Sequence, residues 1–213
     1  TNTALKGMVE ECFIAADVLE NARDTAVSYR YIRAAADSAL FGGRAYLVAG
    51  GAKITEAYTQ QLLYYVAIQD GKVGSIVPLV QSTMGYTADL SLFEGKGYAE
   101  IAALEGSDLE SDAETGATLT NTALRDMVLE CLLAEDVFAS PETLPAGLTY
   151  VRAAGGSALF GGESFLAEGN ADLSEYNYRQ PLLFYINIAD GKVAQIIPLR
   201  QRTMGHTAEI SLF

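Results

Sequence analysis

The chain has 213 residues, of which 50% are hydrophobic and 19% charged, and its formal net charge is -13 at pH 7. This length and apolar fraction are sufficient for a packed globular core. Its 14 lysines and arginines are outnumbered by 27 acidic residues, which argues against nucleic-acid binding because contact with phosphates requires clustered basic side chains. No apolar run is long enough to cross a membrane. We expect a soluble protein, either cytoplasmic or secreted after processing.

The two halves of the chain repeat one another. TNTALKGMVEEC at 1–12 returns as TNTALRDMVLEC at 120–131, SALFGG at 38–43 returns at 157–162, and TMGYTADLSLF at 83–93 returns as TMGHTAEISLF at 203–213. This unit is much longer than the repeats of solenoid proteins. The pattern predicts two α+β domains at 1–93 and 120–213, joined by an acidic linker at 94–119. The linker lacks the glycine and final glutamate of an EF-hand loop, so we expect no calcium site there.

Each repeat begins with a predicted amphipathic helix. Apolar residues recur three and four positions apart, which is the pattern of one helix face. The stripe consists of Leu5, Met8, Val9, Cys12, Phe13 and Ala16 in the first repeat and of Leu124, Met127, Val128, Cys131 and Leu132 in the second. Because both cysteines fall inside it, we expect buried, unreactive thiols.

The later part of each repeat is predicted to be an antiparallel sheet. Asp70-Gly71 and Asp190-Gly191 each separate two β-rich runs, which is a strong hairpin signal. A two-residue turn pairs Ile68 with Val73, and regular continuation pairs Val66 with Ser75 and Tyr64 with Val77. We expect the closing segments at 83–93 and 203–213 to form one more strand each. The outer faces are also apolar, so we expect the repeats to pair within the chain as a pseudo-dimer, with further self-association possible.

One known superfamily shares this order of elements. A leading helix, a glycine-containing segment (LFGGRAYLVAGG, LFGGESFLAEGN) and a long hairpin around DGKV resemble the ketosteroid-isomerase-like superfamily, also called nuclear-transport-factor-like or SnoaL-like. The resemblance implies an α+β protein with two repeated cone-like domains, each with helices packed on a curved antiparallel sheet around an apolar pocket. Members include isomerases, cyclases, dehydratases and proteins that only bind ligands.

Carboxylates and phenols are the candidate acid–base groups. Asp17 and Asp136 border the apolar stripes, where burial beside a cavity would raise the pKa of a carboxyl group and suit it to proton transfer near neutral pH. A strand phenol can donate to a developing oxyanion, and a histidine titrates near neutral pH. The predicted catalytic residues are Asp17, Asp136, Tyr65, Tyr185 and His206. Their structural alternatives are a helix-end cap or salt bridge, packed tyrosines and a neutral hydrogen-bonded histidine.

Further residues are predicted to bind a substrate. An inward arginine can hold a carboxylate, although a surface ion pair is the alternative, and pocket tyrosines can either contact a ligand or simply pack. The predicted substrate-binding residues are Tyr31, Tyr150, Arg33, Arg152, Tyr64 and Phe184.

Three function classes agree with these patterns. The first is a cofactor-independent isomerase, cyclase or hydratase that acts on a small apolar organic substrate. The second is a non-catalytic binder of a small hydrophobic ligand, and the third is a structural or interaction module. The chain has a single histidine and lacks the spacing of a metal site and a phosphate-binding loop. We therefore expect neither a metal nor a cofactor.

Overall fold

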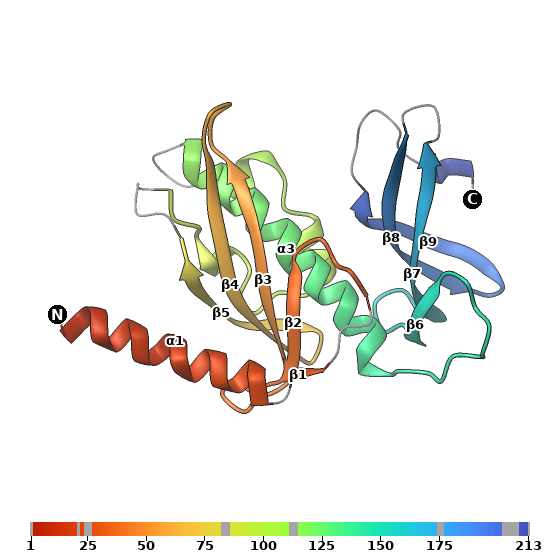
Figure 1. Cartoon of the computed structure of the whole chain (residues 1–213), viewed down its shortest axis with the longest axis horizontal. Coiled ribbons are helices and arrows are strands. Elements are labelled where there is room, and N and C mark those ends of the chain that lie inside the picture. Colours follow the sequence, from red (N-terminus) through yellow and green to blue (C-terminus); the bar gives the residue numbers. More distant parts are fainter. Residues whose placement is uncertain are drawn as a thin grey trace. The chain divides into compact units, whose positions relative to one another are not determined.

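The computed structural model describes residues 2–20, 22–23, 27–81, 86–110, 115–173, 177–201 and 209–212 (Figure 1). The chain divides into two compact units. The first consists of Thr1–Thr25 and Tyr31–Leu132, and the second of Ala26–Arg30 and Leu133–Phe213. Each unit is built on one antiparallel sheet, with strand order β1-β2-β3-β4-β5 in the first and β6-β7-β8-β9 in the second.

The first unit carries most of the helical structure. Its elements are α1 (Asn2–Glu20), β1 (Ala22–Arg23), β2 (Ile32–Asp37), β3 (Arg44–Lys53), β4 (Thr59–Gln69), β5 (Lys72–Val80), η1 (Leu90–Leu92), α2 (Tyr98–Ala102), η2 (Gly106–Leu109) and residues 115–132 of α3 (Thr115–Ala139). Buried residues anchor the segment between β5 and α3 to this unit, namely Phe93, Ile101 and Leu109. The segment therefore belongs to the packed core of the first unit.

The hairpin turn is confirmed, but the register beyond it differs from the expectation. Ile68 pairs with Val73 around Asp70 and Gly71, whose φ angles of 51° and 71° suit a tight two-residue turn. A β-bulge follows, so that Val66 pairs with Ile76 and Tyr64 with Pro78. One extra residue in β5 therefore moves Val77 and Leu79 to the opposite face of the sheet.

Different helices cover the two faces of the first sheet. We call one face the α3 face, because a side chain added at Gly50 would lie 2.3 Å from Cε of Met127. Side chains alternate along a strand, so this face also carries fully buried residues of β3 and β4: Tyr46, Val48, Leu62, Tyr64 and Val66. On the other face, Ile14 of α1 packs in a cluster with Ala45, Tyr65 and Ala67.

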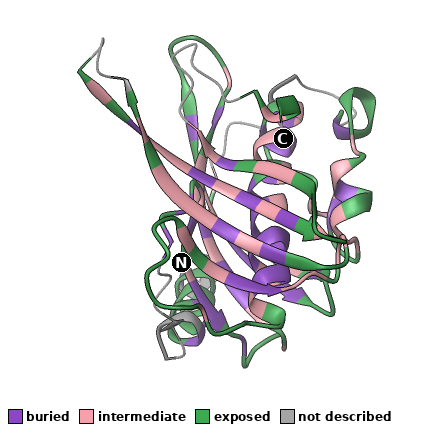
Figure 2. Cartoon of the chain, turned by 90° about the vertical axis from the view of Figure 1, so that its right-hand side faces the viewer, coloured by how far each residue is buried: buried purple, intermediate pink, exposed green. Residues whose placement is uncertain are grey.

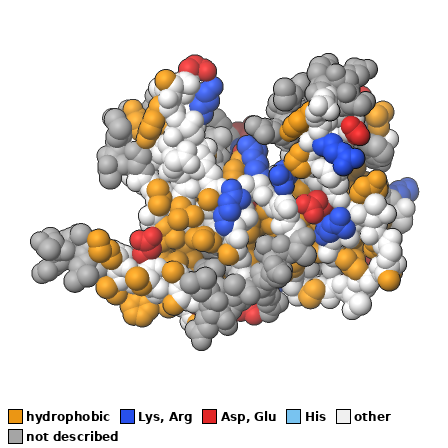
Figure 3. Space-filling view, in the orientation of Figure 1, with side chains coloured by type: hydrophobic (Ala, Val, Ile, Leu, Met, Phe, Trp, Pro, Cys, Tyr) orange, Lys and Arg blue, Asp and Glu red, His pale blue; other side chains and the backbone are white. Residues whose placement is uncertain are grey.

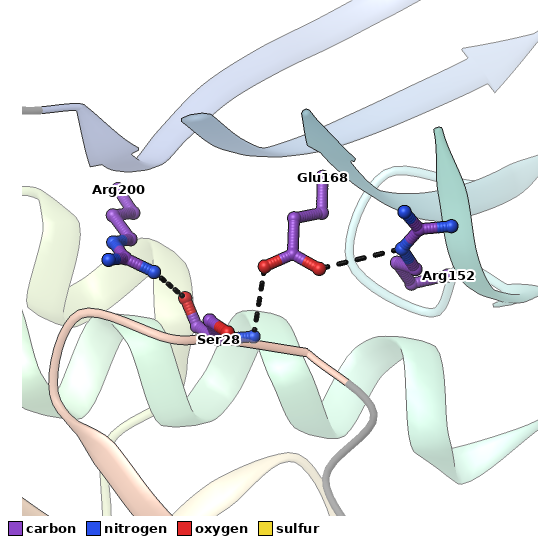
Figure 4. Close-up of polar contacts among 4 residues, drawn as sticks. All are labelled: Ser28, Arg152, Glu168 and Arg200. Atoms are coloured by element: carbon purple, nitrogen blue, oxygen red, sulfur yellow. Dashed lines mark hydrogen bonds and ion pairs between the residues drawn. The ribbon is translucent and has the colours of Figure 1, made fainter. Parts of the chain in front are cut away.

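The second unit has less helical cover. It contains residues 133–139 of α3, followed by β6 (Val151–Gly156), β7 (Glu163–Leu173), β8 (Tyr178–Ala189), β9 (Lys192–Gln201) and η4 (Ile210–Leu212). Residues 26–30 also belong to it, with Val27 and Tyr29 buried. Their backbone is held by Glu168 Oε1, which accepts from Ser28 N (3.4 Å), and by Arg200, which donates to Ser28 O (3.2 Å) (Figure 4).

The expected fold of two cone-like domains in an intrachain pseudo-dimer is wrong. The protein is a sheet-rich α+β structure with one helix-rich region, and that region lies in the first unit. The reason is the placement of α3, which was expected to cover the sheet of its own repeat. Most of its apolar stripe is buried in the first unit instead, so the second unit retains only the last turns of this helix.

One smaller expectation is also wrong. The closing segments do not form strands in their described parts, because Leu90–Leu92 and Ile210–Leu212 are 3₁₀ helices. Buried and half-buried residues alternate from 183 to 187 of β8 (Figure 2), whereas residues 64–68 of β4, whose sheet has both faces covered, are all buried. Among the described residues, no helix combines the length and apolar character of a membrane span.

Candidate functional site

Two predicted catalytic residues of the first unit lie together in a buried cluster. Asp17 Oδ2 accepts from the hydroxyl of Tyr65 (2.6 Å) and from that of Ser38 (2.9 Å), and these hydroxyls are 2.8 Å apart. Asp17 Oδ1 accepts from the backbone N–H groups of Ala39 (2.7 Å) and Leu40 (3.2 Å). We call Asp17, Ser38 and Tyr65 the first Asp–Ser–Tyr cluster. It joins the end of α1 to the turn between β2 and β3.

The second unit repeats this arrangement. Asp136 Oδ2 accepts from the Tyr185 hydroxyl (2.6 Å), which lies 3.2 Å from Oγ of Ser157. Asp136 Oδ1 accepts from the backbone N–H groups of Ala158 (2.8 Å) and Leu159 (3.1 Å). Asp136, Ser157 and Tyr185 form the second Asp–Ser–Tyr cluster. It joins the end of α3 to the turn between β6 and β7.

The repeated SALFGG segment builds the turn that holds each carboxylate. In the first unit Ser38 N donates to Gly43 O (2.9 Å), and Phe41 N donates to Oγ of Ser38 (3.1 Å). Gly43 has a φ of 68°, and a side chain added there would lie 2.1 Å from Ile68 O. Only glycine fits this backbone conformation at such close approach. The turn therefore presents two N–H groups in a fixed direction toward Asp17.

The environment of the first cluster favours a charged aspartate and neutral tyrosine. Burial, the largest influence, raises the pKa of Asp17, but the hydrogen bonds from Tyr65, Ala39, Ser38 and Leu40 outweigh it and leave this pKa below its ordinary 3.8. Burial and then the hydrogen bond to Asp17 raise the pKa of Tyr65 well above its ordinary 10.0. The Asp17 carboxylate is therefore stabilised as an anion, opposite to the raised pKa expected from the sequence.

Other predicted site residues lie apart from these clusters. On the α3 face, the Tyr64 hydroxyl donates to Oε1 of Gln81 (2.6 Å). Tyr31 N donates to Oε2 of the buried Glu130 (2.7 Å), and Arg33 donates to Ala49 O (3.4 Å).

In the second unit, Tyr150 is 61% exposed and Phe184 is half-buried. Arg152 Nε lies 3.4 Å from Glu168 Oε2 (Figure 4), so it forms an ion pair. His206 lies outside the described residues. The roles assigned to all these residues from the sequence stay predictions.

Sequence reasoning missed Ser38 and Ser157, although a signal for them was available. Both stand in SALFGG, which is identical in the two repeats and whose glycines were interpreted only as turn residues. It also placed both cysteines in the core, whereas Cys131 is buried and Cys12 is exposed. Among the described residues, no group of three or more His, Cys, Asp and Glu side chains could hold a metal ion.

A cavity of about 550 Å³ lies in the first unit beside the middle of α1. Its lining is mostly apolar and comes from α1, the β2–β3 turn and β5: Glu10, Phe13, Ile14, Leu40, Phe41 and Val77. Three of these are large apolar side chains that remain exposed, with Phe13 at 62%, Leu40 at 46% and Phe41 at 42%. The Phe41 ring contacts the ring of Tyr65, with 5.6 Å between the ring centroids. The first Asp–Ser–Tyr cluster thus supports one wall of the cavity.

Comparison with known proteins gives no relative for this chain, since no family model, curated protein or solved structure matches it.

Proposed function

We propose that the protein binds a small apolar molecule, without transforming it, in the cavity between α1 and the β2–β3 turn. The observation that carries the proposal is the exposure of Phe13, Leu40 and Phe41 around one hollow of about 550 Å³. Ligand cavities typically have volumes of about 300–1,000 Å³ and predominantly apolar walls. An apolar ligand would remove these three side chains from water, which is favourable at roughly 25 cal/mol per Å² of buried surface.

The first Asp–Ser–Tyr cluster supports binding better than acid–base catalysis. A general base that works near neutral pH needs a pKa near that pH, whereas the pKa of Asp17 is lowered. Both oxygens of its carboxylate already accept hydrogen bonds, and the raised pKa of Tyr65 keeps the phenol protonated. In our proposal the first cluster is structural. It fixes the turn that positions Leu40 and Phe41 at the cavity.

A titration of the full chain with Nile red, a neutral apolar dye, tests the proposal. An uncharged probe is suitable because the net charge of -13 would repel an anionic one. We expect saturable binding at one site, with a blue-shifted emission. Leu40→Gln and Phe13→Gln should each weaken binding by about tenfold, since each removes apolar contact worth about 1.4 kcal/mol or more.

Met8→Gln is the matched control. Met8 is also a 62% exposed apolar residue of α1, but it does not line the cavity. Its replacement should leave the dye affinity unchanged. If Met8→Gln weakens binding as much as Leu40→Gln does, the dye is adsorbing to exposed apolar surface and the cavity is not the site.

A further inference from the structure

The same apolar stripe has opposite environments in α1 and α3. In α3 its residues Met127, Val128 and Cys131 are completely buried in the first unit. The equivalent residues of α1 are Met8, Val9 and Cys12. Met8 is 62% and Val9 45% exposed, and Cys12 is exposed. Figure 3 shows hydrophobic side chains on the surface of the described part of α1. The stripe of α1 therefore has the composition of a packing surface but lacks the cover that its counterpart has.

Equivalent faces of the two sheets also differ in burial. Tyr46, Leu62 and Tyr64 on the α3 face of the first sheet are 0–2% exposed. The equivalent face of the second sheet, which we call the open face, is apolar but only half-buried along its described length. It consists of Phe165, Ala167, Leu182, Phe184 and Ile186. The second sheet thus retains the apolar character of a helix-covered face.

α3 makes two specific contacts with the first sheet. The residues equivalent to these contacts are present in α1 and in the second sheet, but they do not contact one another in the same way. Gly50 leaves the space that Met127 fills, and its equivalent is Gly169, where an added side chain would meet only the ring of Tyr150. Glu130 of α3 accepts from Tyr31 N (2.7 Å). Its equivalent is Glu11, which is exposed, and the equivalent of Tyr31 is Tyr150. Both helix and sheet therefore preserve the residues of the α3 contact.

We propose that α1 of one molecule packs on the open face of the second sheet of another copy of this chain. Met8 would lie over Gly169, and Glu11 would accept a hydrogen bond from Tyr150 N. The occupant is inferred from the order of elements along the chain. α3 is anchored through Asp136 to the sheet that follows it, while its earlier turns are buried with the sheet that precedes it.

A second copy supplies the corresponding sheet for α1. α1 is anchored through Asp17 to the first sheet, which follows it, and the second sheet of another copy can take the preceding position. Such a contact joins two different surfaces, so each added copy presents the same pair again, and the copies associate head to tail as an open chain or a closed ring. Because each copy carries a net charge of -13, salt should strengthen the association by screening the repulsion between copies.

Photo-crosslinking of the full chain tests this contact. Photo-methionine, which has nearly the shape of methionine, replaces all four methionines, and equal amounts of unlabelled and ¹⁵N-labelled chains are mixed. Met127 is the internal standard, because it must cross-link to β3 or β4 around Gly50. We expect Met8 to cross-link to β7 or β8 around Gly169, with light–heavy pairs about as frequent as light–light and heavy–heavy pairs combined.

With the Met127 cross-link present, three results would overturn the proposal. The first is a cross-link from Met8 to the second sheet only in light–light and heavy–heavy pairs, which would place α1 on its own chain. The second is a cross-link from Met8 to another surface. The third is no cross-link from Met8 at concentrations where Met127 reacts.

Sedimentation velocity with a charge-matched pair of variants provides a second readout. Met8→Asp places a carboxylate in the stripe, and we expect it to weaken association at least about tenfold. Gly7→Asp adds the same charge to the same helix, but Gly7 lies away from the stripe and an added side chain there meets nothing within 4 Å. It should associate like the wild type. Equal effects of the two variants, or a wild type that stays at 22.7 kDa at every concentration and salt, would contradict the contact.

Discussion

The Tyr65 hydroxyl donates a hydrogen bond of 2.6 Å to Oδ2 of Asp17, and the phenol and carboxylate come from residues that are 0% and 5% exposed. A bond of this length from a phenol to a carboxylate is among the stronger hydrogen bonds in proteins. Its repetition between Tyr185 and Asp136, also at 2.6 Å, indicates that duplication kept the whole cluster. Each cluster connects a helix end to the sheet that follows the helix.

Removal of this hydroxyl should destabilise the first unit. We expect Tyr65→Phe to lower the free energy of unfolding by about 1.5–3 kcal/mol, the range for a hydrogen bond to a charged group. Urea unfolding followed by circular dichroism measures the loss. Tyr150→Phe is the control, because Tyr150 is 61% exposed and its hydroxyl should matter by less than about 0.5 kcal/mol. Equal stability of Tyr65→Phe and the wild type would mean that the Ser38 hydroxyl alone satisfies Oδ2 of Asp17.

Local patterns in the sequence predicted local structure well. The period of apolar residues predicted α1, and Asp70-Gly71 predicted the hairpin turn with Ile68 paired to Val73. The sequence also placed Asp17 at the border of the stripe, where it is indeed buried. The bulge in β5 was not predicted, because one extra residue leaves the alternation of apolar residues readable in either register. It exchanged the faces assigned to Ile76 and Val77.

The placement of α3 is a different kind of failure. Its stripe is nearly identical to that of α1, so nothing in either helix says which sheet it covers. Partner choice depends on chain connection, because the glycine that makes room for Met127 in the first sheet, Gly50, has its equivalent in the second sheet at Gly169. A hydrophobic pattern specifies that a face is covered, but two equivalent sheets leave the choice of cover open.

The lowered pKa of Asp17 predicts loss of stability in acid. Its folded-state pKa is below the ordinary 3.8, so the unfolded chain binds the proton first as the pH falls. The contribution to stability is therefore complete above the unfolded-state value and is lost as the pH falls through the lower folded-state value. We expect the free energy of unfolding to fall below about pH 4. Asp17→Asn should be less stable at neutral pH and should lose less on acidification; an unchanged acid slope would contradict this.

The raised pKa values of the buried tyrosines predict loss of stability in alkali. Burial, followed by the hydrogen bond to a carboxylate, raises the pKa of Tyr65 and of Tyr185 above 10.0. The unfolded chain therefore releases these protons first as the pH rises, and the stability present below pH 10 is lost above it. Ultraviolet absorbance of tyrosinate should rise together with unfolding. If Tyr65 and Tyr185 instead titrate at an ordinary pKa while the protein stays folded, their pKa values are not raised and this prediction is wrong.

Alanine substitutions at the glycines of two tight turns should measure backbone strain and steric collision separately. Gly71 and Gly43 have φ angles of 71° and 68°, but an added side chain meets nothing within 4 Å at Gly71 and lies 2.1 Å from Ile68 O at Gly43. Gly71→Ala should therefore cost only the left-handed backbone penalty of about 1–2 kcal/mol. Gly43→Ala should cost at least about 1–3 kcal/mol more, because the chain must move to relieve the collision. Urea midpoints at an unchanged m-value measure the difference.

The collision at Gly43 should also weaken the first Asp–Ser–Tyr cluster. Gly43 O accepts from Ser38 N (2.9 Å), so movement at Gly43 displaces the N–H groups of Ala39 and Leu40 from Asp17. The losses in Gly43→Ala and Asp17→Asn should then be less than additive in the double variant, since both variants disrupt the same hydrogen bonds. Strict additivity would mean that the turn absorbs the added methyl group without moving these N–H groups, and that the glycine and the carboxylate stabilise the unit independently.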